Sequence, residues 1–329
     1  MKPVLLALRA LGIGDLATAV PALRALRRAF PRHELVLAAP PALTPLAMAI
    51  GAVDRAFPTG SFVRDPIDEI RWNARRPDIA VNLHGKGPQS HRALLAADPI
   101  RFLAYAQPAA GWPDGPKWNE DEHERDRWCR LLHWHGIPAD PDDLAVPAPP
   151  PVPEWAGAVV VHPGASGPER RWPVARFAAV ARRLAAAGQR VLVSGSPGEA
   201  ADAQALAAAA GLPPNSVLAG RTDLGALAAL VAHARLVICG DTGVAHLATA
   251  YGTRSVLLFG PVSPELWGPP PGNDRHTVLW RGPHGLADIG VDDVYVAACA
   301  QLEAAAWDGG LDALVPEHGG GVRDAAATR

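Results

Sequence analysis

A short turn near the start of the chain carries two glycines and an acid, a combination that allows two kinds of chemistry. Residues 12–17 read Gly-Ile-Gly-Asp-Leu-Ala and fit the G-x-G-x-x-A pattern of dinucleotide-binding turns. Asp15 directly follows Gly14, where its charge would oppose a bound pyrophosphate. A carboxylate at such a turn can instead act as a general base on a hydroxyl group. The turn therefore predicts either a cofactor loop or a catalytic acid.

A second candidate lies in residues 162–173, which read His-Pro-Gly-Ala-Ser-Gly-Pro-Glu-Arg-Arg-Trp-Pro. This stretch combines flexible glycines with the hydroxyl of Ser166 and two adjacent cations, Arg170 and Arg171. Guanidinium groups suit phosphate because their planar fork forms bidentate, charge-assisted hydrogen bonds. We therefore predict that this turn contacts a phosphorylated ligand.

Two more turns lead into helices in the second half of the chain. Residues 194–202 read Ser-Gly-Ser-Pro-Gly-Glu-Ala-Ala-Asp and place Glu199 at the start of a helix. Residues 240–252 read Gly-Asp-Thr-Gly-Val-Ala-His-Leu-Ala-Thr-Ala-Tyr-Gly. The free N–H groups at the start of this second helix can hold an anion, next to Asp241, Thr242 and Gly243.

Each of these residues also has an ordinary structural interpretation. Arg170 and Arg171 fit a solvated loop pair, because most surface charges bind nothing specific. Asp241 fits a helix N-cap, and Glu199 is favoured at a helix start by the helix dipole. His246 lies within an apolar helix and is interpreted as a structural residue. The functional prediction therefore depends on the turns in combination.

The elements that position these turns alternate between strands and helices. Apolar runs of strand length occur at 4–8, 34–39, 78–83, 158–161, 190–194, 236–239 and 255–259. Between them, apolar residues recur at helical spacing, for example at Leu16, Val20 and Leu23. This alternation predicts α/β architecture with parallel sheets covered on both sides. Ligands of such sheets bind beyond the carboxyl ends of the strands, where all four turns lie.

A proline-dense stretch divides the chain into two domains. Residues 138–155 include seven prolines and can form neither a helix nor a central strand. We predict an N-terminal domain over 1–150 and a C-terminal domain over 151–307, with a helix at 291–306. The glycine-rich residues 308–329 are predicted to form a flexible tail.

Composition limits the classes of protein that fit. The 329 residues are 49% hydrophobic and 19% charged with a formal net charge of −2, which gives no bulk attraction for nucleic acid. No apolar run has the length of a signal segment or a membrane span. The widely spaced Cys129, Cys239 and Cys299 suggest neither disulfides nor a zinc site. We expect a cytoplasmic protein with at most peripheral contact with the inner face of a membrane.

The four turns in this order and spacing resemble family 9 of the glycosyltransferases, the heptosyltransferases of lipopolysaccharide core assembly. The resemblance covers roughly residues 4–267, is strongest from Val159 onward, and rests most specifically on the Asp-Thr-Gly-x-x-His motif followed by Leu-Phe-Gly-Pro. It implies a GT-B fold, in which two Rossmann-like domains with parallel sheets face a central cleft. The acceptor would bind to the N-terminal domain and the nucleotide sugar to the C-terminal domain, and the helix 291–306 would pack back on the N-terminal domain.

The resemblance also implies a role for each motif residue. Asp15 would be the general base, and Glu199 would contact the nucleoside ribose. Arg170 stands where the family usually has lysine and would contact the donor diphosphate. Asp241 would lie near the donor sugar, with the backbone of Thr242 and Gly243 on the phosphates.

The implied reaction is metal-independent transfer with inversion from a nucleotide-diphosphate sugar, ADP-heptose by family analogy. The nucleotide sugar is a substrate, so we expect neither a cofactor nor a metal. An Asp-x-Asp metal motif occurs at Asp140–Asp142, but it lies in the predicted linker. The acceptor is expected to be a glycan, a lipid-linked sugar or a small hydroxyl compound. Its predicted contacts are Gly14, Lys86, His91 and Arg92, and the segment 118–128.

Two other functions fit parts of the sequence. An NAD-dependent oxidoreductase would use the glycine turn, but it needs an acid at the end of the second strand. Glu34 instead stands at the start of that strand, which ends in Ala38-Ala39. A non-catalytic nucleotide-sugar binding protein would need the C-terminal turns but not Asp15.

Overall fold

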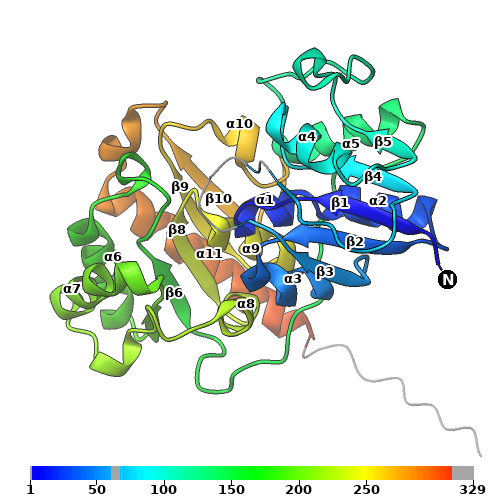
Figure 1. Cartoon of the computed structure of the whole chain (residues 1–329). Coiled ribbons are helices and arrows are strands. Elements are labelled where there is room, and N and C mark those ends of the chain that lie inside the picture. Colours follow the sequence, from blue (N-terminus) through cyan, green and yellow to red (C-terminus); the bar gives the residue numbers. More distant parts are fainter. Residues whose placement is uncertain (1, 61–66, 68, 313–329) are drawn as a thin grey trace, which may run out of the picture.

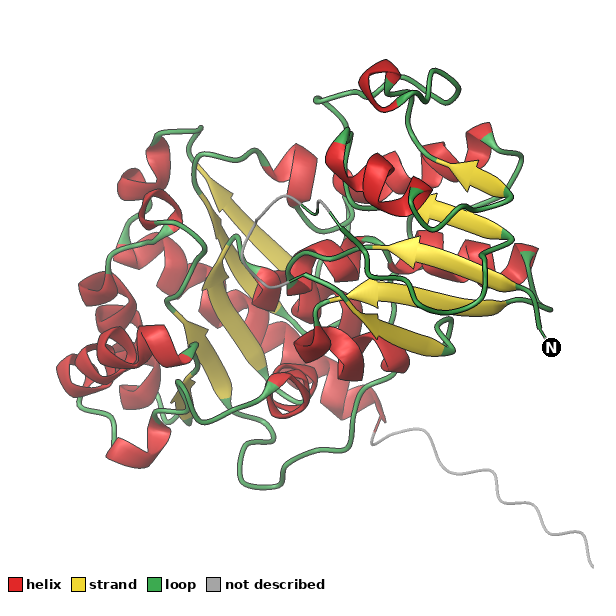
Figure 2. Cartoon of the chain, in the orientation of Figure 1, coloured by secondary structure: helices red, strands yellow, loops and turns green. Residues whose placement is uncertain are grey.

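The computed structural model describes residues 2–60, 67 and 69–312, and within them it contains two five-stranded parallel sheets. The sheets stand apart in the molecule, each with helices packed against it (Figures 1 and 2). Their strand orders are β3-β2-β1-β4-β5 and β10-β9-β8-β6-β7. The predicted α/β architecture with two parallel sheets is confirmed.

The first sheet is built from runs of aliphatic residues. Every residue of β1 and of β4 is buried, as is typical of parallel strands covered on both faces. Its strands are β1 (Val4–Leu8), β2 (Glu34–Ala39), β3 (Arg55–Pro58), β4 (Ile79–Asn82) and β5 (Arg101–Leu103). Its helices are α1 (Ile13–Thr18), α2 (Val20–Ala29), α3 (Thr44–Ala49), α4 (Gln89–Leu95) and α5 (Glu124–Trp134).

The second sheet repeats this pattern. Its strands are β6 (Val159–His162), β7 (Val191–Val193), β8 (Leu236–Gly240), β9 (Ser255–Phe259) and β10 (His276–Trp280). Its helices are α6 (Val174–Ala186), α7 (Ala200–Ala210), α8 (Leu224–Ala232), α9 (Gly243–Tyr251), α10 (Pro264–Trp267) and α11 (Val291–Asp312). Short 3₁₀ helices occupy Pro41–Leu43, Pro108–Ala110, Pro168–Arg170, Pro197–Glu199, Pro214–Ser216 and Gly285–Asp288.

Three strands were not predicted from the sequence, namely β3, β5 and β10. All three lie at sheet edges, and β3 and β10 are largely half-exposed. β5 has only three residues and begins with the exposed Arg101. Such strands lack the continuous apolar run that identifies a central strand. The seven predicted strands correspond to the central strands and to the edge strand β7.

The helices α1 and α9 join the two halves of the molecule. They pack against each other between the two sheets, near the centre of Figure 1. The approach is close because a Cβ on Gly14 would lie 2.5 Å from the His246 ring, and a Cβ on Gly243 would lie 2.8 Å from Ile13 Cβ. One cluster of buried apolar residues runs through this contact and includes Leu16 of α1 and Leu247 of α9.

The C-terminal helix packs differently from the prediction. Val294, Ala298 and Leu302 recur at helical spacing and are buried in the apolar cluster of the second sheet. The principal contacts of α11 are accordingly with α6, β8, β9 and β10, not with the N-terminal domain as predicted. The helix extends to Asp312, so it includes the first residues of the predicted tail, while residues 313–329 lie outside the described part of the chain.

The stretch 138–155 connects the two sheets without forming a helix or a strand. It is held against the first domain, where Asp143 forms ion pairs with Arg24 and Arg28 of α2. Its Val146 N–H also donates to the carbonyl of Ala250 in α9. Among the described residues, no helix is both long and apolar enough to cross a membrane.

Candidate functional site

A cleft of about 830 Å³ lies where the carboxyl ends of the two sheets meet. Residues from both domains line it, and they come mostly from turns that follow strands. The first domain contributes Gly12, Ile13, Gly14, Asp15 and Ala42. The second contributes a larger set that includes Ser166, Arg170, Glu199, Asp241, Thr242 and Gly243. The cleft therefore brings together the opening turn and the three later turns that the sequence singled out.

The opening turn presents Asp15 from the first turn of α1. Gly12, the N-cap of α1, donates its backbone N–H to Asp15 Oδ2 at 3.0 Å. The Asp15 side chain is 14% exposed, so part of it reaches the cleft. Asp15 Oδ2 thus already accepts the hydrogen bond from the Gly12 N–H, which a pyrophosphate bound at this turn would need. This geometry disfavours a dinucleotide at the turn and leaves a carboxylate facing the cleft.

Arg170 and Asp241 form an ion pair in the opposite wall. Arg170 ends the 3₁₀ turn after β6, and its Nη1 lies 3.1 Å from Asp241 Oδ2. Asp241 follows β8 and is 7% exposed. The Arg170 side chain is 23% exposed, so the guanidinium has donors left for a ligand in the cleft. Ser166 lies in the same turn and also lines the cleft.

Glu199 is fixed by its own turn. Its Oε2 accepts hydrogen bonds from the Ser196 N–H at 2.7 Å and from the Ser196 hydroxyl at 2.8 Å. This is a capping box, in which side chain and backbone satisfy each other at a helix start. A Cβ on Gly164 would lie 2.1 Å from Glu199 Oε1, so that position leaves space for the carboxylate only as glycine.

Thr242 caps the nine-residue helix α9, and its Oγ1 accepts from the Val244 N–H at 3.2 Å. The cap leaves other N–H groups of the first helical turn free to meet an anion in the cleft. Together with Arg170, this helix start allows the wall of the cleft formed by the second domain, here called the second wall, to bind an anion.

Two histidines line the cleft. His246 contacts Trp267 edge to face, with ring centroids 5.7 Å apart, and the residue is half-buried at the edge of the cleft. Its structural role stays a prediction. His162 ends β6 and lies 3.0 Å from Ser194 Oγ through Nδ1. Burial lowers the pKa of both histidines, so both rings are neutral at pH 7.

The predicted acceptor contacts at the end of β4 do not line the cleft. His91 is fully buried, and its Nε2 lies 2.8 Å from the Tyr105 carbonyl. Lys86 forms an ion pair of 2.5 Å with Glu120, and Arg92 donates to the Ala109 carbonyl at 2.7 Å. Their predicted role in binding an acceptor is not supported, because the turn after β4 directs these side chains to protein partners.

Arg171 also lies outside the cleft lining, in contrast to its neighbour Arg170. Its guanidinium donates to the Ala165 carbonyl at 3.3 Å and lies 3.9 Å from Asp202. Consecutive residues that leave a 3₁₀ turn point in different directions, so only one of the two arginines reaches the cleft. The prediction of a paired arginine site is wrong in this respect.

The predicted acceptor segment 118–128 contributes buried structure to the first domain. Its residues Glu124, Arg127 and Trp128 are almost fully buried and interact with one another. Glu124 also reaches Arg9, which lies behind Asp15. The sequence pattern gave no reason to connect residues more than a hundred positions apart, and this support for Asp15 was missed.

Other lining residues were missed as well, namely Ala42, Glu169, Thr222, Asp223, Leu224, Leu227 and Trp267. Most of them lie at the end of a motif or at the start of a helix, where the sequence contains no pattern typical of ligand binding. Asp223 offered one signal, because an acid before an apolar helix is typical of an N-cap, and its side chain accepts from the Ala226 N–H. That signal predicts a helix start but not a ligand.

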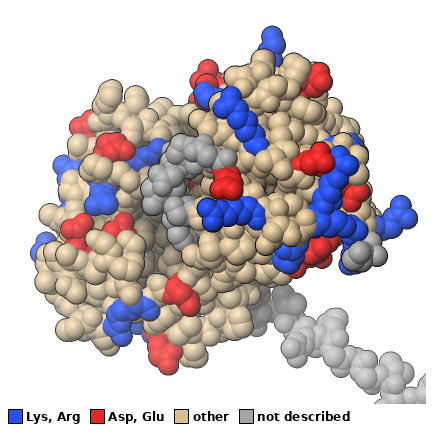
Figure 3. Space-filling model, in the orientation of Figure 1, with Lys and Arg blue, Asp and Glu red and all other residues tan. Residues whose placement is uncertain are grey.

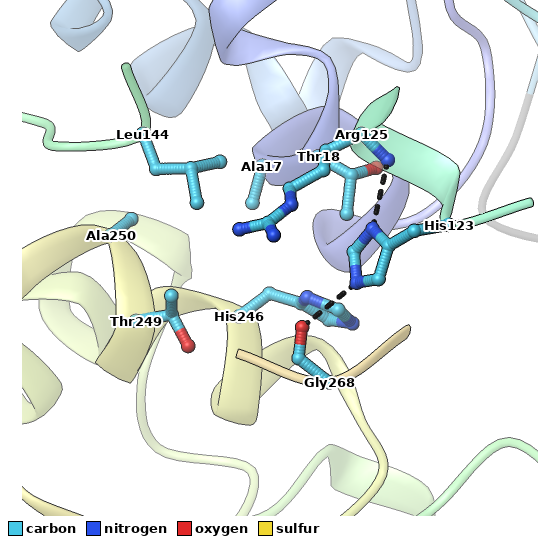
Figure 4. Close-up of a pocket in the computed structure, with 9 residues that line it drawn as sticks. All are labelled: Ala17, Thr18, His123, Arg125, Leu144, His246, Thr249, Ala250 and Gly268. Atoms are coloured by element: carbon cyan, nitrogen blue, oxygen red, sulfur yellow. Dashed lines mark hydrogen bonds between the residues drawn. The ribbon is translucent and has the colours of Figure 1, made fainter. Parts of the chain in front are cut away.

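A second, much smaller cavity lies behind the cleft, between α1, α5 and α9 (Figure 4). Its volume of about 20 Å³ is enough for one water molecule. His123 forms one wall, and its Nε2 lies 3.0 Å from the Gly268 carbonyl of the second domain. This contact ties the two domains together next to the cleft.

The surface charge is mixed on the face seen in Figure 3, and the described residues form no metal-binding cluster. Lysine and arginine are interspersed with aspartate and glutamate on the face seen in Figure 3, which shows no extended area of one sign. Within the described ranges, no group of three or more His, Cys, Asp or Glu side chains is arranged to hold a metal ion.

The second domain matches a known family in sequence. Residues 148–288 match the model of Glycosyltransferase family 9 (heptosyltransferase). The chain is also 34% identical over 113 residues to lipopolysaccharide heptosyltransferase 3 of Escherichia coli. That alignment covers 34% of this chain and 33% of the relative, so the sequence similarity extends over about a third of each protein.

Similarity of fold extends over both domains. The structure of E. coli ADP-heptose lps heptosyltransferase II aligns with 92% of this chain and 99% of its own, with a TM-score of 0.73 at 21% identity. The structure of E. coli heptosyltransferase WaaC with ADP gives a TM-score of 0.68 at 19% identity, and the alignment again covers 92% of this chain and 99% of that one. At these identities the similarity establishes a shared fold.

Proposed function

We propose that the chain belongs to glycosyltransferase family 9 and that it is a metal-independent, inverting glycosyltransferase with Asp15 as its general base. The observation that carries the proposal is that a carboxylate and a set of anion-binding groups face each other across one cleft. Asp15 projects from the first wall of the GT-B fold, and Arg170 and the start of α9 lie in the second. Transfer from a nucleotide-diphosphate sugar needs both a base and a site for the departing charge.

The proposed reaction is a single displacement. Asp15 removes the proton from an acceptor hydroxyl while the hydroxyl oxygen attacks the anomeric carbon of the donor. The bond from that carbon to the diphosphate oxygen breaks on the opposite side, and the nucleoside diphosphate departs with the electron pair. Because no enzyme nucleophile intervenes, the configuration at the anomeric carbon is inverted.

The second wall would bind the donor. Arg170 and the free N–H groups next to Thr242 and Gly243 would bind the diphosphate, and Glu199 would bind the ribose. Arginine at position 170 departs from the lysine usual in the family, and its planar fork favours bidentate contact with a phosphate. The E. coli heptosyltransferase of similar fold, solved with ADP, supports ADP as the nucleotide part of the donor.

Heptose is the sugar that the family assignment favours, and we propose ADP-heptose as the donor. The acceptor carries a hydroxyl group and is a glycan, a lipid-linked sugar or a small compound. Among the described residues that line the cleft, Arg170 is the single lysine or arginine, whereas five are acidic: Asp15, Glu169, Glu199, Asp223 and Asp241. This balance favours an acceptor of low negative charge. We propose that the reaction takes place in the cytoplasm, with at most peripheral membrane contact.

A ligand panel followed by a transfer assay tests the proposal. Thermal unfolding is measured with ADP, UDP, GDP, NADH and ADP-heptose, and ADP is expected to raise the unfolding temperature more than UDP or GDP. The protein is then incubated with ADP-heptose and candidate acceptors, and release of ADP is measured with and without acceptor. A response to NADH alone would indicate an oxidoreductase. Stabilisation by ADP-heptose without any release of ADP would indicate a binding protein.

A further inference from the structure

Four charged side chains of alternating sign extend from the cleft into the first domain: Asp15, Arg9, Glu124 and Arg127. Arg9 Nη2 lies 3.4 Å from Asp15 Oδ1 and 2.8 Å from Glu124 Oε1. Glu124 Oε2 in turn lies 2.8 Å from Arg127 Nη1. We refer to these four residues as the charge chain. Only its first member lines the cleft.

Arg9 holds the backbone of Asp15 as well as its side chain. Its side chain is fully buried, and Nε donates to the Asp15 carbonyl at 2.8 Å. Nη1 donates to the Leu83 carbonyl at 2.6 Å, which ties the guanidinium to the end of β4. The guanidinium also lies over the Trp128 ring, 4.7 Å from its centroid. Arg9 is therefore fixed on every side and can hold the turn that carries Asp15.

The two oxygens of Asp15 are held from two directions. Oδ2 accepts from the Gly12 N–H at 3.0 Å, and Oδ1 faces Arg9 Nη2 at 3.4 Å. A general base must lie within hydrogen-bond reach of the proton that it removes. A misplacement of about 1 Å at a reacting centre can cost about a hundredfold in rate, so a carboxylate fixed in this way has a kinetic advantage.

Glu124 forms the shorter of the two ion pairs that Arg9 makes with carboxylates. Its Oε1 accepts from Arg9 at 2.8 Å and from Trp128 Nε1 at 3.1 Å. A buried cation without a partner is costly, and Glu124, which is 5% exposed, provides that partner. Because Glu124 takes the short ion pair, Arg9 makes only a long contact with Asp15 Oδ1. This oxygen is therefore not blocked by a strong salt bridge when an acceptor hydroxyl approaches.

We propose that Arg9 is a positioning residue that holds the general base Asp15 in place. We further propose that Glu124 prevents Arg9 from forming a short ion pair with Asp15. The inference rests on the proposed function, since it assigns Arg9 and Glu124 to the site of Asp15. It also gives a role to the segment 118–128, which supports the cleft from behind rather than lining it.

Kinetics of Arg9→Met and Glu124→Gln test the inference. Both variants are expected to lower kcat by about 10- to 100-fold, because the base is misplaced in the first and captured by Arg9 in the second. The Kd of ADP, which binds to the other wall, should stay within about twofold of the wild-type value. Arg9→Lys, which keeps the charge, should restore part of kcat.

A matched control is Arg254→Met in the second domain. Arg254 is 7% exposed and donates to Gln301 Oε1 at 2.8 Å, so its loss also removes a buried arginine. This variant should lose stability and keep kcat. If Arg9→Met and Arg254→Met lower kcat equally, or if Arg9→Met and Glu124→Gln both keep kcat within twofold, the inference is wrong.

A double variant separates positioning from general stability. If Arg9 acts through Asp15, adding Arg9→Met to Asp15→Asn should lower the residual rate no further, whereas a merely structural role would lower it again. Failure of the proposed function looks different, because Asp15→Asn would then keep full activity or the wild type would transfer nothing. In that case crystal structures of the wild type and of Arg9→Met still decide the inference, since an unmoved Asp15 side chain overturns it.

Discussion

Both walls of the cleft are built from strand–turn–helix units, but the units of the two walls present different kinds of groups. In the first wall, the turn between β1 and α1 exposes one carboxylate and supports it from behind through Arg9 and Glu124. In the second wall, turns after β6, β7 and β8 each contribute a group, and these groups are held by partners within the same wall. In the first wall, one charged residue depends on support from distant segments, whereas in the second wall several groups are held by nearby residues.

This difference predicts which parts of the molecule tolerate substitution. A site made of several local contacts loses binding in steps as each contact is removed. A site that depends on one acid loses its chemistry at once, and it also depends on residues far from it in the chain. The predictions that follow test this contrast, from the largest expected effect to the smallest.

Asp15→Asn should have the largest effect. The amide keeps the size of the carboxylate but cannot take a proton, so kcat should fall by about 10²- to 10⁴-fold. The Kd of ADP, measured by titration calorimetry, should change little because ADP would bind to the opposite wall. An unchanged kcat would remove Asp15 from the role of general base.

Arg170→Met should weaken donor binding and affect chemistry less. Loss of charge-assisted hydrogen bonds worth about 1.5–3 kcal/mol corresponds to a roughly 10- to 100-fold higher Kd for ADP. Arg170→Lys, which keeps the positive charge, is the control and should stay within a few-fold of the wild type. Equal ADP affinity in all three proteins would contradict a diphosphate contact at this position.

How well each wall could be predicted follows the same contrast. In the second wall, Arg170, Glu199, Asp241 and Thr242 could be selected from the sequence because each lies in a short motif after a strand. The sheets themselves were predictable for the same reason, since their central strands are continuous apolar runs. Local patterns therefore accounted for the strands and for the residues at their ends.

What could not be predicted depends on contacts between distant segments. The pairing of Arg9 with Glu124 joins positions 115 residues apart, and no local pattern encodes it. His91 was predicted to be a surface ligand because its segment is polar, but the fold buries it with Nε2 2.8 Å from the Tyr105 carbonyl. The packing of α11 was assigned by analogy, whereas the apolar stripe that directs it to the second sheet has a partner only in the folded chain.

Two glycines at the contact between α1 and α9 provide a third test, which measures how closely the two walls are packed. Gly243→Ala would place a Cβ 2.8 Å from Ile13 Cβ, and Gly14→Ala would place one 2.5 Å from the His246 ring. Overpacking of this kind typically costs about 1–3 kcal/mol. Gly243→Ala should be the more damaging, because Ile13 lies in α1 close to the backbone, whereas the His246 ring can turn away. Thermal unfolding measures both, and the reverse order would show that the His246 ring is the more rigid partner.

The last test uses acidic pH and concerns a histidine away from the cleft, which affects stability but not the site. His276 at the start of β10 is 8% exposed, its Nδ1 lies 2.8 Å from Ser255 Oγ, and its buried Nε2 has no hydrogen-bond partner in the described structure. Burial, followed by the charges of Arg275 and Arg254, lowers the pKa of His276 to about 4, with a smaller opposite effect of Asp274. The folded state therefore stays unprotonated at pH 5, while the unfolded chain binds a proton.

Because the unfolded state binds more protons between pH 6.5 and pH 4, acidification through this range should destabilise the fold. At pH 5 the loss from this one residue is about 2 kcal/mol relative to pH 7.5. His276→Asn keeps a polar group near Ser255 but cannot be protonated, so its unfolding temperature should fall less than that of the wild type between pH 7.5 and pH 5. An equal fall in both proteins would mean that the acid sensitivity arises elsewhere, with His84 beside Arg9 as the next candidate, because burial also lowers its pKa to about 4. His84→Asn would then distinguish the first domain from the second, since His84 Nδ1 accepts from the Ala10 N–H at 3.2 Å, whereas His276 begins β10 of the second sheet.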